Sequence, residues 1–149
     1  MNASSHREPI RIFLIEDNPG DVELTKEALA DSKILNELSV ATDGGKALER
    51  LRSDAVAKTL PDLILLDLNL PGLNGRQVLA EIKSNLALKR IPVIILTSSQ
   101  AESDIAASYD LHANCFITKP IEFTQFMKVV RTIENFWFSI VRLPDKDTP

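Results

Sequence analysis

The chain has 149 residues, a length typical of one domain, and its 44% hydrophobic and 26% charged residues suit a soluble α/β protein. A net charge of −4 and a pI near 5.2 argue against nucleic acid as a partner. Its single cysteine, Cys115, excludes an internal disulfide, and we find neither a secretory signal nor an apolar run of about 20 residues. We therefore expect a cytoplasmic protein that does not span a membrane.

The first part of the chain alternates between strand-like and helix-like segments. Residues 10–15 are predicted to form a strand, after which Asn18 and Pro19 supply an N-cap and a first-turn proline for a helix. Residues 38–41 alternate as a short second strand, and a helix is predicted from Gly44 to about residue 53.

The same alternation continues to the last helix. Further strands are predicted at 62–66, 91–96 and 114–117, and further helices at 75–85, near 100–110 and from Ile121 onwards. Strands that alternate with helices in this way form a parallel sheet covered on both faces. The pattern predicts a flavodoxin-like three-layer α/β sandwich, in which a five-stranded parallel sheet of order 2-1-3-4-5 has helices on both faces.

Four of the predicted strands end in polar side chains that complement one another. Glu16 and Asp17 follow the first strand, Asp67 the third, Thr97 the fourth and Lys119 the fifth. In such sheets ligands bind beyond the carboxyl ends of the strands, at the switch point between the first and third strands. We therefore expect an acid cluster, a hydroxyl and an amine to meet at one edge of the sheet.

This combination indicates phosphoryl chemistry assisted by a divalent cation. Three carboxylates so close together repel one another unless a cation neutralises them. Glu16, Asp17 and Asp67, with the backbone carbonyl of Asn69, would provide the oxygen ligands that Mg²⁺ prefers, and Mn²⁺ or another divalent cation can substitute. Asp67 would act as the nucleophile on a phosphoryl group whose charge is neutralised by the cation and by Lys119.

Each of these residues, taken alone, has a simpler interpretation. An Asp after a strand is often a turn former, and a Lys before a proline is usually a solvated surface group. The Thr97 hydroxyl is placed either to donate to a phosphate oxygen or to cap the next helix, and both roles are compatible. The joint arrangement, in which each group meets a need created by another, favours the phosphoryl-accepting site.

At these spacings the residues resemble the receiver domains of two-component response regulators over positions 9–142. The resemblance implies a receiver domain at residues 9–143. Residues 1–8 and 144–149 are polar and are expected to be flexible termini, and the lack of a linker or a helix-turn-helix candidate predicts no output domain. The resemblance implies the following residue roles: Asp67 as phosphoacceptor, with Thr97 and Lys119 as catalytic partners; Glu16, Asp17, Asp67 and the Asn69 carbonyl as metal ligands; Thr97 and Phe116 as switch residues; and a cis peptide bond before Pro120.

A narrower likeness lies in residues 108–120, 135–138 and 143–144, which are similar to the small response regulators paired with cyanobacterial phytochromes. It implies phosphotransfer from a histidine kinase of the phytochrome type. It also implies a homodimer formed through the face of the fourth helix, fifth strand and fifth helix. His112 stands where receivers generally carry Gly, and we interpret it as neither catalytic nor metal-binding.

The last helix is more apolar than one buried face requires. Projected at 100° per residue, its apolar arc covers about 200°, against roughly 100° for a helix with one buried face. The candidate dimer contacts are Phe136, Trp137, Phe138 and Ile140. The alternative is that this tail folds back over its own core.

Two other functions stay open. A haloacid-dehalogenase-like phosphatase also uses a strand-end Asp and Mg²⁺, but it requires a second Asp two residues later, where this chain has Asn69. An adaptor that works without phosphorylation usually lacks one or more site residues, whereas this chain has all of them. We expect a phosphoacceptor that catalyses its own phosphorylation and slow dephosphorylation, signals through protein contacts and is not a turnover enzyme.

Overall fold

The computed structural model describes residues 9–30, 35–98 and 115–132. Its strands are β1 (Ile10–Ile15), β2 (Asn36–Ala41), β3 (Leu63–Asp67), β4 (Val93–Thr97) and β5 (Cys115–Thr118). Its helices are α1 (Pro19–Ala30), α2 (Gly44–Ala57), α3 (Gly75–Ser84) and α5 (Phe123–Thr132). The helix predicted near 100–110 and the four candidate dimer residues lie outside the described residues.

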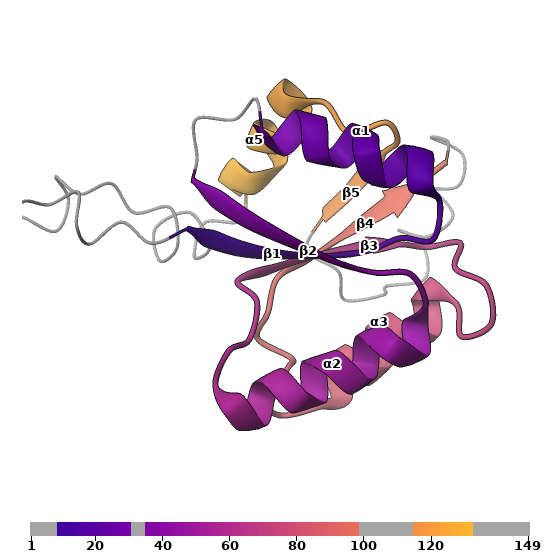
Figure 1. Ribbon diagram of the computed structural model, residues 1–149, viewed down its shortest axis with the longest axis vertical. Coiled ribbons are helices and arrows are strands. Elements are labelled where there is room, and N and C mark those ends of the chain that lie inside the picture. The colour runs from indigo at the N-terminus through magenta and orange to yellow at the C-terminus, as the bar shows by residue number, and fades with distance from the viewer. Residues whose placement is uncertain (1–8, 31–34, 99–114, 133–149) are drawn as a thin grey trace, which may run out of the picture.

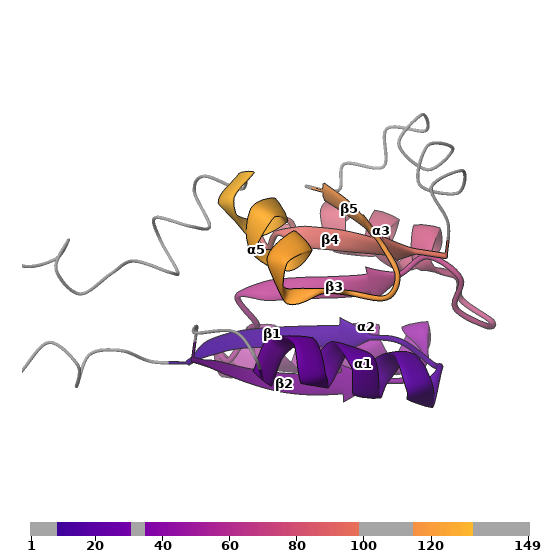
Figure 2. The same cartoon turned by 90° about the horizontal axis from the view of Figure 1, so that it is seen from above.

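The described strands form one parallel sheet of order β2-β1-β3-β4-β5. Helices α1 and α5 cover one face of the sheet, and α2 and α3 cover the other (Figures 1 and 2). This is the three-layer sandwich that the sequence predicts. None of the helices among the described residues is long and apolar enough to cross a membrane.

The sheet separates two apolar cores because successive side chains of a strand point to opposite faces. In β3, Ile64 and Leu66 pack in the core on the α2 and α3 side, whereas Leu63 and Leu65 pack in the core on the α1 and α5 side. All four side chains are fully buried. An uninterrupted apolar run was therefore the right signature of a central strand covered on both faces.

Several predicted boundaries are wrong by a few residues. Helix α2 ends at Ala57 and not near residue 53, and its C-cap, Lys58, has φ 62° and donates its N–H to the Asp54 carbonyl. In the last turn of α2, Ala55 is only partly buried against the core and Val56 is exposed, so little apolar periodicity marked it. Strand β2 starts at Asn36, two residues early, because it pairs with Ile10 through the backbone.

The three strands β3, β4 and β5 each begin and end later in the chain than the sequence predicts. β3 includes Asp67, which pairs with Leu96, and β4 runs from Val93 to Thr97, whereas residues 91 and 92 precede it. β5 extends to Thr118, and α5 begins at Phe123, two residues later than predicted. Asp67 and Thr97 thus belong to the paired strands themselves, which hold their backbones rigidly.

A close backbone approach joins β3 to α3. Gly75 is the first residue of α3, whose N-cap Asn74 forms a capping box with Gln77. A Cβ atom at Gly75 would lie 2.5 Å from the Asp67 carbonyl oxygen and 2.6 Å from the Leu68 Cα. Only glycine lets α3 start this close to the end of β3.

We predict that Gly75→Ala destabilises the protein by about 1–3 kcal/mol, because rigid backbone atoms must move to admit the methyl group. Gly45→Ala is the matched control, since it also lies in the first turn of a helix but its Cβ would meet the Asp43 Oδ1 at 3.5 Å, an ordinary contact. Urea denaturation of both variants measures the difference. Equal midpoints for Gly75→Ala and the wild type would contradict the expectation.

Candidate functional site

Three carboxylates meet beyond the carboxyl ends of β1 and β3. These strands are neighbours, with Ile15 paired to Leu66, so Glu16 and Asp17 come to lie beside Asp67. Carboxylate oxygens of these three residues all lie within 4.8 Å of one another. Glu16 and Asp67 are buried and Asp17 is exposed, which leaves the cluster open to solvent on one side.

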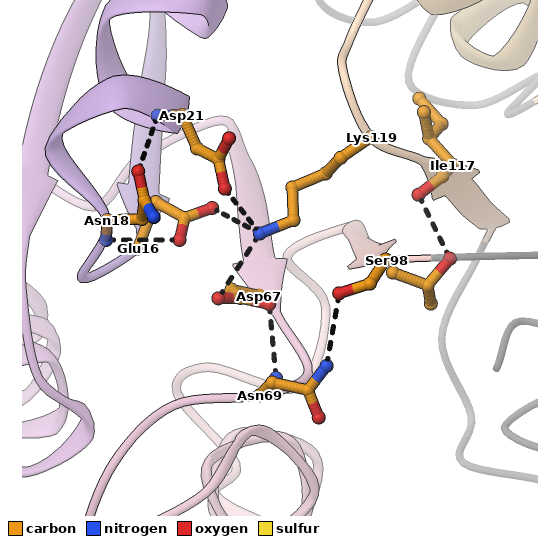
Figure 3. A network of polar contacts seen from close by, with 9 residues as sticks. Glu16, Asn18, Asp21, Asp67, Asn69, Ser98, Ile117 and Lys119 are labelled. Carbon is orange, nitrogen blue, oxygen red and sulfur yellow. Dashed lines mark hydrogen bonds and ion pairs between the residues drawn. The ribbon is translucent and has the colours of Figure 1, made fainter.

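Lys119 reaches this cluster from the end of β5 (Figure 3). Its ammonium nitrogen lies 3.1 Å from Glu16 Oε1, 2.8 Å from Asp21 Oδ2 and 3.5 Å from Asp67 Oδ2. The Lys119 N–H donates to the Thr97 carbonyl at 2.7 Å, which fixes its backbone to the end of β4. The peptide bond between Lys119 and Pro120 is cis, as the resemblance implies.

Burial and the neighbouring charges shift the pKa values of Glu16 and Lys119. Burial, together with the hydrogen bond to Asp67 and the charge of Asp67, outweighs the opposing effect of Lys119 and raises the pKa of Glu16 from 4.5 to about 7. For Lys119, burial alone would lower the pKa, but the hydrogen bond to Asp21 and the charges of Asp67 and Glu16 outweigh it and raise the pKa.

Asn69 holds the loop that follows Asp67. Its backbone N–H donates to Asp67 Oδ1 at 3.1 Å, and its side-chain amide donates to Ser98 Oγ at 3.4 Å (Figure 3). The first contact orients one carboxylate oxygen, and Lys119 faces the other. That the Asn69 carbonyl ligates a metal ion stays a prediction.

The two predicted switch residues lie next to the site. Thr97 is completely buried at the end of β4, and its hydroxyl lies 3.5 Å from the Ile117 carbonyl, to which it donates. Phe116 is half-buried and packs against the core on the α2 and α3 side. Their movement on activation stays a prediction, and the segment that Thr97 would cap lies outside the described residues.

Sequence reasoning missed Asp21, which makes the shortest of the three Lys119 contacts. An acid in the first turn of a helix is stabilised by the helix dipole, so Asp21 had an ordinary structural explanation. The useful signal was its position: α1 follows β1 directly, so the amino end of α1 lies at the same sheet edge as the carboxylate cluster.

The donor set fits a hard divalent cation. The Lys119 ammonium contacts the carboxylates of Glu16, Asp21 and Asp67, and Asp17 adds a fourth acid to the cluster, so this single positive charge does not balance the acids around it. Divalent cations such as Mg²⁺ prefer carboxylate and carbonyl oxygens and retain several waters. A surface cavity of about 400 Å³, lined in part by Asp17 and Asn69, provides room for those waters beside the cluster.

Comparison with known proteins identifies one family. The family model described as "Response regulator receiver domain" matches residues 12–131. The response regulator Rcp1 of Synechocystis sp. is 47% identical over 138 residues, which cover 91% of this chain and 94% of that protein. A structure of Rcp1 in its Mn²⁺-bound form has a TM-score of 0.66 at 47% identity and covers 87% of this chain and 94% of that one.

Two further solved structures are similar. The bacteriophytochrome response regulator AtBRR has a TM-score of 0.79 at 42% identity, with 87% of this chain and 96% of that chain covered. The phosphorylated cyanobacterial phytochrome response regulator RcpA has a TM-score of 0.69 at 50% identity, with 89% and 96% covered. Both likenesses extend over nearly the whole of the related chains.

We predict that cation affinity depends on pH through Glu16. The pKa of Glu16 is raised to about 7 in the folded, metal-free protein, so the carboxyl holds a proton there that it would lose in the unfolded chain. The contribution of this proton to the free energy of unfolding is complete below the unfolded pKa of 4.5 and is lost as the pH rises through 7. A cation that binds Glu16 must expel this proton at lower pH. Calorimetric titration with Mg²⁺ should therefore show affinity about tenfold weaker near pH 6 than near pH 8.

The control is Glu16→Gln, which cannot titrate and should lose most of this pH dependence while binding more weakly at both pH values. A wild-type affinity that is the same at both pH values would contradict the expectation.

Proposed function

The chain belongs to the response regulator receiver family, and on that premise we propose that Asp67 accepts a phosphoryl group from the phosphohistidine of a histidine kinase. The observation that supports this most directly is the surroundings of Asp67. It is a buried carboxylate at the end of β3, grouped with Glu16 and Asp17 and contacted by Lys119 at 3.5 Å.

The geometry suits attack by Asp67 on phosphorus. Its Oδ1 accepts the Asn69 N–H and its Oδ2 faces Lys119, so both oxygens are oriented before a donor arrives. A new O–P bond to Asp67 forms as the P–N bond of the phosphohistidine breaks, and the imidazole leaves with the bonding electron pair. The Lys119 ammonium is close enough to neutralise charge on the transferring group.

The cation we propose is Mg²⁺, held by Glu16, Asp17, Asp67 and the Asn69 carbonyl. When bound, it would neutralise the negative charge of the carboxylates and of the transferring phosphoryl group. Mn²⁺ should substitute, which is supported by the Mn²⁺-bound form of the related Rcp1.

We propose a phytochrome-type photoreceptor kinase as the donor, since the relatives named above include cyanobacterial and bacterial phytochrome response regulators. Phosphorylation would replace the single negative charge of the Asp67 carboxylate by a phosphoryl group that carries about −1.5 to −2. That charge would draw the Thr97 hydroxyl from the Ile117 carbonyl and let Phe116 turn inward. The signal would pass on by protein contact in the cytoplasm, without multiple-turnover catalysis.

We also propose that the receiver domain, at residues 9–143, forms a homodimer through the face that contains β5 and α5. The support is the subgroup likeness and the wide apolar arc of the last helix. The adaptor and the phosphatase are less well supported, because the chain retains every expected site residue of a phosphorylated receiver.

Incubation with acetyl phosphate and Mg²⁺ should add one phosphoryl group to the wild-type protein. The Asp67→Asn variant should gain none under the same conditions, because an amide cannot act as the nucleophile. Intact-protein mass spectrometry measures the modification. The matched control is Asp62→Asn, at the opposite end of β3, where the carboxylate accepts the Arg11 N–H at 2.8 Å. Multiple-turnover release of phosphate would instead favour a phosphatase, and absence of modification an adaptor.

The dimer has a separate test. We predict that Phe136→Ser combined with Ile140→Ser weakens self-association by about a hundredfold, as loss of two apolar contacts at an interface centre does. Asn135→Ala, on the polar side of the same projected helix, is the control. Sedimentation velocity with and without phosphodonor measures the association, and a wild-type protein that is monomeric in both conditions would contradict the proposal.

A further inference from the structure

Asp21 occupies a distinct position among the partners of Lys119. It lies in the first turn of α1, and its side chain makes the closest contact to the ammonium group, at 2.8 Å. Glu16 and Asp67, the other two partners, belong to the three-residue cluster that could hold a metal ion, whereas Asp21 does not. Figure 3 shows Asp21 approaching Lys119 from the α1 side.

The local backbone fixes Asp21 in this place. Its N–H donates to the Asn18 side-chain oxygen at 3.0 Å, and the Asn18 N–H lies 3.3 Å from Glu16 Oε2, to which it donates. The first turn of α1 is thereby tied to the residue that ends β1. This cap uses the backbone N–H of Asp21 and not its side chain, so the carboxylate can pair with Lys119.

A cation at the acid cluster creates a problem for Lys119. The lysine side chain is only 14% exposed, and two of its three partners, Glu16 and Asp67, are the carboxylates that the cation would engage. An ammonium group deprived of its partners in a largely buried place is strongly destabilised. It would either leave the site or compete with the cation for the same oxygens.

We propose that Asp21 is a positioning residue that keeps Lys119 paired, and close to Asp67, while Glu16 and Asp67 are engaged by the cation. Asp21 acts through Lys119 and does not touch the reacting atoms. When the phosphoryl group arrives, it offers Lys119 a new anionic partner within reach of its present position. This inference rests on the proposed function, because it assumes that the cluster binds a divalent cation.

The test is the affinity of the unphosphorylated full-length protein for Mg²⁺, measured by calorimetric titration. In Asp21→Asn, Lys119 can pair only with Glu16 and Asp67, so Mg²⁺ must compete with it. We expect an affinity about tenfold weaker, which corresponds to about 1.4 kcal/mol. The substitution is isosteric, and the helix cap uses the backbone of Asp21, so the fold is retained.

Two controls separate this role from a general effect of charge. Glu23→Gln removes the same charge from the same helix, but Glu23 is exposed and pairs with Lys26 at 3.4 Å, so its affinity for Mg²⁺ should change less than twofold. In a Lys119→Met background, Asp21→Asn should also change the affinity for Mg²⁺ less than twofold, because the lysine through which Asp21 acts has been removed. If Lys119→Met does not fold, the comparison of Asp21→Asn with Glu23→Gln decides.

The outcomes are distinguishable. An unchanged affinity in Asp21→Asn, or an equal loss in Glu23→Gln or in the Lys119→Met background, would overturn the inference while leaving the proposed function intact. A wild-type protein that binds no Mg²⁺ would overturn both. A loss confined to Asp21→Asn in the presence of Lys119 would support the inference.

Discussion

The ammonium group of Lys119 holds the site together, because it contacts carboxylates that come from three separate places in the chain. Asp21 belongs to α1, Glu16 follows β1 and Asp67 ends β3, and each lies within 3.5 Å of the same nitrogen. Without the positive charge of Lys119 these carboxylates would repel one another in a largely buried place. The charge balance around Lys119 therefore decides whether Asp67 is held in a reactive position.

The fold makes this convergence possible. In a parallel sheet of order 2-1-3-4-5, the ends of β1 and β3 are neighbours at the switch point, and β5 brings Lys119 to the same edge. The two apolar cores keep these ends fixed, and the glycine at position 75 lets α3 begin against the backbone of Asp67. The rigid part of the molecule therefore positions the backbone, and the charged side chains complete the site.

Much of this could be predicted from the sequence, since strand order and strand ends follow from apolar runs and from the residues that interrupt them. Asp67 and Lys119 were identifiable because each comes at the end of a predicted buried strand, where complementary groups from the other strands meet. The contact of Asp21 was not, because it joins residues 98 positions apart through two side chains. The final turn of α2 was also missed, since it contributes only the partly buried Ala55 to the core and so leaves little periodic signal.

The pairing of Lys119 beside a bound cation is directly visible in a crystal structure with Mn²⁺, located by its anomalous scattering. We predict one ion among the carboxylates of Glu16, Asp17 and Asp67, with the Lys119 ammonium still paired to Asp21. An ion bound elsewhere, or a Lys119 side chain turned out into solvent when the ion is present, would contradict this prediction.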